Sequence, residues 1–251
     1  MARFGHERPE PTKKFNDRFP FDHDTPDGYQ FFLNLGPLSN VNARHFKEEI
    51  AFWTEAMQHE TYDEFWQARN LRPHLKNTRR AVMTVGGWFD AEDLYGALAI
   101  YQAIEARNPN IFNMLVMGPW QHGGWNRTNG DRLGNILFNA RTSTLYRDKI
   151  ERPFFAHFLK DEGELDLPEA YVFETGANQW RTFDDWPPPH VQEKHLYARE
   201  NAELSSDLPT DTTDEAAYDE FISDPAKPVP FSEAIAIGMT REYMTDDQRF
   251  A

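Results

Sequence analysis

The sequence contains no cysteine in its 251 residues. Disulfide bonds, thiolate metal sites and a cysteine nucleophile are therefore excluded. No apolar run approaches the ~20 residues that a helix needs to cross a bilayer, so no membrane partner is expected. The first residues, "MARFGHERPEPTKKFNDRFPFDHD", hold no apolar segment and are not a secretory signal. Any signal peptide would lie upstream of this chain, and the compartment stays open.

Basic residues are also scarce, because 26 Lys and Arg face 41 Asp and Glu and leave a formal net charge of −15. The deficit lies almost wholly after residue 160, where six basic residues accompany 22 acidic ones. A near-neutral part followed by a strongly acidic part indicates a boundary near that point. Binding to a phosphate backbone needs a basic face, so nucleic acid is not expected as a partner.

The chain does have enough apolar material for a folded core, with 39% hydrophobic and 14% aromatic residues. Residues 1–40 are rich in Pro, Gly, Asp and Asn and are expected to be irregular. Residues 41–70 carry apolar side chains at helical spacing, which predicts two short helices with a break near His59.

Residues 80–118 form the clearest unit. "AVMTVGG" and "IFNMLVMG" are short apolar runs that end in glycine, as buried strands do, and helical periodicity from Ala91 lies between them. A strand, helix and strand in this order predict a βαβ unit with two parallel strands. A further helix is expected near 140–160, interrupted at Pro153.

The sequence changes character after "DEGELDLPEA". Short β-like runs, "AYVFET", "QWRTF", "KHLYA" and "YDEFISD", alternate with Pro, Gly, Asn and Asp. This pattern is typical of an all-β domain. The acidic stretch "RENAELSSDLPTDTTDEAA" is expected to be a loop.

Asp90 and His122 follow the two predicted parallel strands directly. Sites in parallel α/β sheets form beyond the carboxyl ends of the strands, so both side chains should lie on one edge. A carboxylate followed in sequence by a histidine is the order of the acid and base in an α/β-hydrolase triad. The carboxylate would orient the imidazole, which would take a proton from a serine.

Other interpretations of these residues remain open. Asp90, with Glu92 and Asp93 behind it, could simply cap the helix and complement its dipole. His122 could be an ordinary histidine in a Gly/Trp-rich turn. A metal-dependent hydrolase built on Asp90, Asp93 and His122 is a weaker alternative, because no second cluster of carboxylates and histidines is visible. We expect neither a metal nor another cofactor.

A nucleophilic serine is missing from the pattern. None of the six serines sits in a G-x-S-x-G turn or between an apolar strand and a helix. Ser39 alone precedes Asp90, but its "GPLSN" context has no buried strand in front of it.

Four motifs in series resemble the X-Pro dipeptidyl-peptidase and cocaine esterase family of serine hydrolases. They are "GGWFDAEDLYGA", "LVMGPWQHGGW", "RPFFAHFLK" and "VFETGANQWRTFDDWPP". The resemblance runs from about residue 28 to the end of the chain and is nearest to the α-amino acid ester hydrolases and glutaryl-7-aminocephalosporanic acid acylases.

The resemblance implies an α/β fold: the C-terminal half of an α/β-hydrolase, with a partial parallel sheet and a helical cap, followed by the start of an all-β jelly-roll. The corresponding boundaries are an extended segment and cap over 1–76, the hydrolase part over 77–164 and the partial jelly-roll over 165–251. Asp90 and His122 match the catalytic acid and base of the family. The family's serine elbow is absent, so the chain is expected to be an internal fragment, inactive alone.

The segment "HETYDEFW" resembles a cap motif of the same family. In the amino-ester branch, two acidic residues at about this place hold the α-ammonium group of the substrate, which points to Asp63 and Glu64. Paired carboxylates suit a cation. Alternatively, Asp63 caps or ion-pairs within the cap helix and Glu64 faces solvent.

The expected function is therefore part of a serine hydrolase that cleaves small-molecule esters or amides, with amino acid esters or β-lactam side chains as candidate substrates. One alternative is an X-Pro dipeptidyl-peptidase. Another is a non-catalytic β-sandwich binding module that uses Trp180 and Trp186, although the simpler interpretation, which we favour, is that these tryptophans pack the domains together. The sequence leaves open the substrate and any homo-oligomer of the intact protein.

Overall fold

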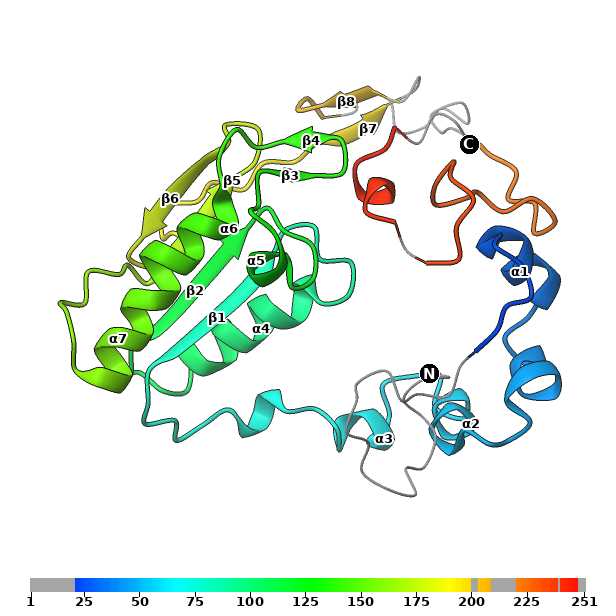
Figure 1. Cartoon of the computed structure of the whole chain (residues 1–251), viewed down its shortest axis with the longest axis horizontal. Coiled ribbons are helices and arrows are strands. Elements are labelled where there is room, and N and C mark those ends of the chain that lie inside the picture. The colour runs from blue at the N-terminus through cyan, green and yellow to red at the C-terminus, as the bar shows by residue number, and fades with distance from the viewer. Residues whose placement is uncertain (1–20, 200–202, 209–219, 239, 248–251) are drawn as a thin grey trace.

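The computed structural model describes residues 21–199, 203–208, 220–238 and 240–247. Its central body is a mixed sheet in the order β1-β2-β5-β6. Helices cover both faces of this sheet, so the predicted α/β class is confirmed (Figure 1). In the described residues, no helix combines the length and the apolar character that crossing a membrane would require.

The βαβ unit forms as the sequence predicts. β1 (Val82–Gly87) pairs in parallel with β2 (Asn113–Gly118) along its whole length, and α4 (Leu94–Glu105) connects them. Every residue of β2 is buried, as expected for a central strand without charged side chains. The helix begins at Leu94, three residues later than the periodicity indicated.

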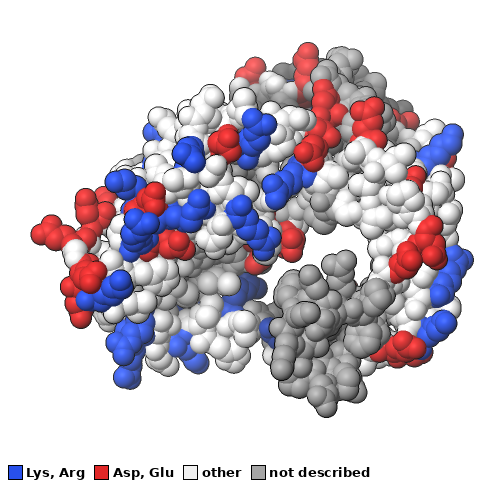
Figure 2. Space-filling view, in the orientation of Figure 1, with Lys and Arg blue, Asp and Glu red and all other residues white. Residues whose placement is uncertain are grey.

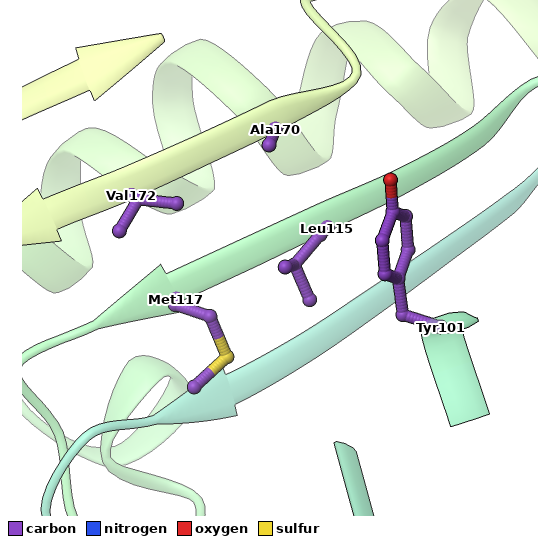
Figure 3. Close-up of a cluster of buried hydrophobic side chains, with 5 residues drawn as sticks. All are labelled: Tyr101, Leu115, Met117, Ala170 and Val172. Atoms are coloured by element: carbon purple, nitrogen blue, oxygen red, sulfur yellow. The ribbon is translucent and has the colours of Figure 1, made fainter. Parts of the chain in front are cut away.

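Alternate residues of β2 supply two separate cores, because successive strand side chains point to opposite faces. Leu115 and Met117 pack with Tyr101 of α4 and with Ala170 and Val172 of β5 (Figure 3). Fully burying one such leucine contributes about 1.5–3 kcal/mol.

Met114 and Val116 face the other way, toward the segment that follows α5 (Gly124–Arg127) and the small β3–β4 hairpin (Arg132–Leu133 and Ile136–Leu137). This segment runs through α6 (Thr142–Leu145), a π-helical stretch η3 (Tyr146–Glu151) and α7 (Arg152–Lys160). Pro153 lies in the first turn of α7, which confirms the interruption predicted there.

The predicted domain boundary after residue 164 is wrong. β5 (Ala170–Glu174) pairs in parallel with β2, and β6 (Gln179–Phe183) pairs antiparallel with β5. Both strands therefore complete the α/β sheet instead of starting an all-β domain over 165–251. A tight turn with Gly176 at φ +88° allows the chain to reverse between them.

After residue 183, the described residues contain one two-stranded antiparallel ribbon, β7 (Tyr197–Arg199) with β8 (Glu203–Ser205). β8 lies in a stretch that the sequence indicated as a loop. The strand predicted at "YDEFISD" is not formed at residues 220–224, and residues 218–219 lie outside the described residues. The described part of 220–247 is irregular apart from one 3₁₀ turn, η5 (Glu242–Met244).

The N-terminal part consists of short helices, as predicted for residues 41–70. They are η1 (Asn42–Phe46), α2 (Ala51–Met57), α3 (Glu64–Gln67) and η2 (Arg72–His74). The break near His59 is confirmed. One helix was missed: α1 (Gly28–Leu35) lies in the stretch expected to be irregular, with Asp27 accepting a hydrogen bond from the Gln30 N–H as its N-cap.

The described elements are arranged in a ring (Figure 1). The described part of 220–247 contacts both the β3–β4 hairpin and α1, where the Gly28 N–H donates to the Ala236 carbonyl over 3.1 Å. Figure 2 shows open space between the α/β body and the N-terminal helices on the face in view.

Candidate active site

Asp90 sits in the turn that follows β1, where its backbone N–H donates to the Gly87 carbonyl. The side chain is 4% exposed. Its Oδ1 accepts hydrogen bonds from the N–H groups of Glu92 and Asp93, each over 2.9 Å. One carboxylate oxygen is thus occupied by the turn, and the other is left for a separate partner.

The helix cap is Asp93 and not Asp90. The Asp93 side chain accepts from the Gly96 N–H over 3.0 Å, in the first turn of α4. Asp90 lies one turn further out and fixes the loop instead of capping the helix. The capping interpretation of the sequence was right about the chemistry but assigned it to the wrong aspartate.

His122 follows β2 and is the partner of the second Asp90 oxygen. Its Nδ1 lies 3.0 Å from Asp90 Oδ2. The two side chains differ in environment, since the imidazole is 47% exposed while the carboxylate is almost completely buried. The predicted placement of both groups on one edge of the sheet is confirmed.

Backbone hydrogen bonds lock the two loops together. The Trp88 N–H donates to the Gly118 carbonyl over 2.9 Å, and the Phe89 N–H donates to the Trp120 carbonyl over 3.1 Å. Gly87 makes this approach possible, because a Cβ at that position would lie 2.1 Å from the Trp120 oxygen. The distance between Asp90 and His122 is therefore set by the backbone.

The environment of Asp90 lowers its pKa. Burial by itself raises the pKa of this carboxyl, but the N–H groups of Asp93 and Glu92 and the ring of His122 stabilise the charged form and outweigh it. Asp90 is consequently a carboxylate over the whole neutral range and can hold a proton on the facing imidazole nitrogen.

A cavity of about 260 Å³ opens beside His122. Its walls come from the loop after β1, the loop and helix after β2, and the C-terminal segment around η5. The lining residues are Phe89, Ala91, Glu92, Gln121, His122, Arg127, Thr240, Arg241, Tyr243 and Met244.

The C-terminal part of this wall was not anticipated from the sequence. Thr240, Arg241 and Tyr243 are more than a hundred residues from His122 in the chain and belong to no motif. Arg127 was missed as well, although it lies only five residues after His122. No local sequence signal distinguishes these residues from other surface side chains.

Asp63 and Glu64 are not brought to this site. Asp63 caps α3 through the Phe65 N–H, and its second oxygen lies 2.6 Å from His59 Nδ1. This hydrogen bond to His59 lowers the pKa of Asp63. Glu64 is exposed, and α3 lies across the opening from β1 (Figure 1). These are the structural roles that the sequence left open as the alternative.

The alternatives based on metal or on exposed tryptophans find little support. Among the described residues, no three His, Asp or Glu side chains are grouped to hold a metal ion. Trp180 packs against Trp120, Tyr171 and Phe173 inside the body, and Trp186 packs on Phe183. The tryptophans therefore serve packing.

None of the described serines is hydrogen-bonded to His122. Ser143 is fully buried, and its hydroxyl donates to the Gly124 carbonyl over 3.3 Å. Ser232 is also buried and bonds within its own turn. The pair has an acid and a base but no nucleophile within the described part of the chain.

The chain is similar to known hydrolases. Residues 15–124 match the X-Pro dipeptidyl-peptidase (S15) family, a range that includes both Asp90 and His122. The cocaine esterase of Rhodococcus sp. (strain MB1 Bresler) is 27% identical over 186 residues, which is 70% of this chain and 31% of the esterase.

Two solved structures are also similar. An aminopeptidase from the marine sediment archaeon Thaumarchaeota archaeon superposes with a TM-score of 0.83 at 33% identity, over 95% of this chain and 40% of that one. An α-amino acid ester hydrolase gives a TM-score of 0.80 at 33% identity, over 90% of this chain and 38% of that one. The chain therefore spans well under half the length of the relatives it matches.

Proposed function

The chain belongs to the X-Pro dipeptidyl-peptidase and cocaine esterase family of hydrolases, and on that premise we propose that Asp90 and His122 are the acid and base of a serine hydrolase acting on esters or amides. The observation that carries the proposal is the 3.0 Å contact between Asp90 Oδ2 and His122 Nδ1 at the ends of two adjacent parallel strands. The relatives named for esters and for peptides support both kinds of bond.

The chemistry follows from the geometry. Asp90 accepts a hydrogen bond from the Nδ1–H of His122, which leaves the other ring nitrogen without a proton. That nitrogen can take the proton of a serine hydroxyl as it attacks a carbonyl carbon, and can then deliver the proton to the leaving group. In the second half of the reaction, the same nitrogen activates the water that hydrolyses the acyl-enzyme.

The serine itself must come from elsewhere. None of the six serines of these 251 residues has the strand–turn–helix setting of a nucleophile. We place it on polypeptide outside this sequence. The relatives are more than twice as long as their match to this chain, which supports the idea.

An assay of the chain by itself tests the missing serine. The expected result is no hydrolysis of p-nitrophenyl acetate or of an amino acid ester above the rate given by the His122→Ala variant. Turnover that His122→Ala abolishes would show that the chain supplies its own nucleophile.

A chimera tests the roles of Asp90 and His122. The matching 40% of the archaeal aminopeptidase would be replaced by this chain, so that the relative supplies the remaining parts. The chimera should hydrolyse an aminoacyl p-nitroanilide, and His122→Gln within it should lower kcat by about 10²–10⁴-fold, the usual contribution of a general base.

The control for this variant is His74→Gln, which changes an exposed histidine of η2. It should keep the activity of the chimera. Equal rates in His122→Gln and His74→Gln would refute the proposed base.

Binding of a substrate ammonium group by Asp63 and Glu64 remains a separate proposal. Glu64 is exposed and free to reach a ligand, whereas Asp63 is already engaged with His59. Glu64→Gln in the chimera should therefore raise KM for an amino-terminal substrate without lowering kcat. An unchanged KM would remove Glu64 from the substrate site.

A further inference from the structure

The connector between the N-terminal helices and β1, residues 68–81, lies beside α4 (Figure 1). It is fixed there by Asn108, a buried side chain just after the helix. The Thr78 N–H donates to Asn108 Oδ1 over 2.8 Å, and Asn108 Nδ2 donates to the Leu75 carbonyl over 3.1 Å. The space between the connector and α4 is therefore a defined feature of the fold.

A cavity of about 580 Å³ opens between η2 of this connector and α4. Sites for small organic ligands usually measure about 300–1,000 Å³, so the cavity has the size of a binding site. It shares no described lining residue with the cavity beside His122. In the described part of the chain, none of its lining residues is acidic.

The charged residues of the lining are Arg72 of η2 and Arg107, which follows α4. Among the described residues, neither forms an ion pair. Neutral groups hold them instead: Arg72 Nη1 donates to the Tyr95 hydroxyl over 2.6 Å, and Arg107 Nη1 donates to the Ala103 carbonyl over 3.0 Å. Both positive charges are thus oriented but not neutralised, in a chain whose formal net charge is −15.

The two groups that hold the arginines belong to opposite ends of one stripe on α4. Tyr95 and Ala103 are eight residues apart in this helix, which corresponds to about 12 Å along its axis. Leu98, Ala99 and Gln102 line the same cavity between them, because helix positions three or four apart share a side. The two positive charges are therefore separated by a largely apolar floor.

We infer that this cavity binds an elongated organic dianion, with one anionic group on Arg72, the other on Arg107, and an apolar chain over Leu98 and Ala99. A medium-chain α,ω-dicarboxylate has this chemistry. Arginine presents a planar set of donors that matches the two oxygens of a carboxylate. The bound dianion would join the connector to the α/β body. This site is separate from the proposed acid–base pair and does not depend on it.

The test compares suberate with suberamate, which has the same length but an amide in place of one carboxylate, and with succinate, which is too short to reach both arginines. Each is titrated into the 251-residue chain at constant ionic strength and neutral pH, and NMR follows the methyl groups of Ala99 and Ala103. Suberate should shift these signals saturably, with a Kd on the order of 1 mM. The other two compounds should bind at least about tenfold more weakly.

The comparison excludes a general electrostatic effect. Because the chain as a whole is acidic, non-specific electrostatics would favour the singly charged suberamate over suberate. The methyl group of Ala170, which is buried in the sheet outside the cavity, should not shift with any of the compounds.

Variants assign the binding to the two arginines. Arg107→Gln should weaken suberate about tenfold, to the level of suberamate, and should abolish the rise in Tm that suberate gives the parent. Arg80→Gln is the matched control, because it changes an exposed arginine of the same connector that does not line the cavity. Arg72→Gln should act as Arg107→Gln does. If Arg72→Gln loses its dispersed NMR spectrum, Arg107→Gln decides alone.

Equal affinity for suberate and suberamate would overturn the inference. So would a folded Arg107→Gln protein that binds suberate as tightly as Arg80→Gln does. Saturable shifts of the His122 ring without shifts of the Ala99 and Ala103 methyl groups would also overturn it, because the ligand would then occupy the other cavity.

Discussion

At the scale of single residues, Asp90 divides its two oxygens between two tasks. Oδ1 holds the turn through the N–H groups of Glu92 and Asp93, and Oδ2 faces His122. The proximity of Asp90 and His122 was predictable, because both follow glycine-terminated apolar strands that had to be parallel. Which residue caps α4 could not be predicted, because Asp90, Glu92 and Asp93 look equivalent in the sequence pattern.

The lowered pKa of Asp90 predicts how stability depends on pH. A carboxyl whose pKa is lower in the folded than in the unfolded state stabilises the fold above its unfolded pKa of about 3.9, and this contribution is lost as the pH falls through the folded pKa. Asp90→Asn should therefore lower Tm near neutrality, and the difference from the parent should shrink below about pH 4.

Thermal unfolding of both proteins between about pH 6 and pH 3 measures this difference. Asp166→Asn is the control, because Asp166 is exposed and its side chain has no hydrogen bond among the described residues. It should change Tm little at any pH. A constant difference between Asp90→Asn and the parent down to the lowest pH would contradict a stabilising charge on Asp90.

At the scale of elements, predictions succeeded where the signal is local. The strand, helix and strand of 82–118 and the interruption at Pro153 depend on periodicity and on proline, which nearby residues determine. The assignment of β5 failed, because "AYVFE" is equally suited to an all-β domain or to the edge of an α/β sheet. Its parallel pairing with β2 is a long-range contact. α1 was missed since the surrounding Pro, Gly and Asp residues conceal a short helix.

The close approach of β1 to the loop after β2 predicts that any side chain at Gly87 destabilises the fold. Gly87→Ala should destabilise the fold by about 1–3 kcal/mol, because its methyl group would overlap the Trp120 carbonyl and force the two loops apart. The hydrogen bond from Phe89 to Trp120 should be lost with it, so His122 should move away from Asp90.

Denaturant unfolding measures the change in stability, and NMR of His122 measures the change in position. Gly238→Ala is the matched control, since a Cβ there meets no atom of the described residues within 4 Å. A Gly87→Ala protein as stable as Gly238→Ala would mean that the two loops are not in close backbone contact.

At the scale of the whole molecule, the C-terminal segment contacts both the β3–β4 hairpin and the start of α1. Asn135 holds residues 245–246, and Ala236 accepts a hydrogen bond from Gly28. Both contacts join segments that are more than a hundred residues apart in the sequence. No sequence motif marks the residues that make these contacts. The cavity wall beside His122 therefore could not be predicted from the sequence, whereas the Asp90–His122 pair could.

The strand order leaves one edge of β1 without a neighbouring strand among the described residues. β1 is a terminal strand of the described sheet, and Val82 and Trp88 donate to the β2 side. Because strand N–H groups alternate in direction, those of Thr84 and Gly86 also face β2, while those of Met83 and Val85 face away from it. We expect the latter two amides to exchange with solvent at least about tenfold faster.

Hydrogen exchange followed by NMR, corrected for intrinsic rates, measures this alternation. Matched protection of all four amides would show that a further strand or a second copy of the chain covers the β1 edge. Concentration dependence of the protection separates those two cases.

The most direct measurement for the proposed acid–base pair is the protonation state of the His122 ring, read from its ¹⁵N shifts at a pH where the imidazole is neutral. With Asp90 accepting at Nδ1, the proton should reside on Nδ1 and leave Nε2 free to act as a base. Asp90→Asn should move it to Nε2, because the amide donates to Nδ1. A parent protein with its proton on Nε2, or one whose tautomer ignores Asp90→Asn, would contradict the assignment of these two residues as a catalytic pair.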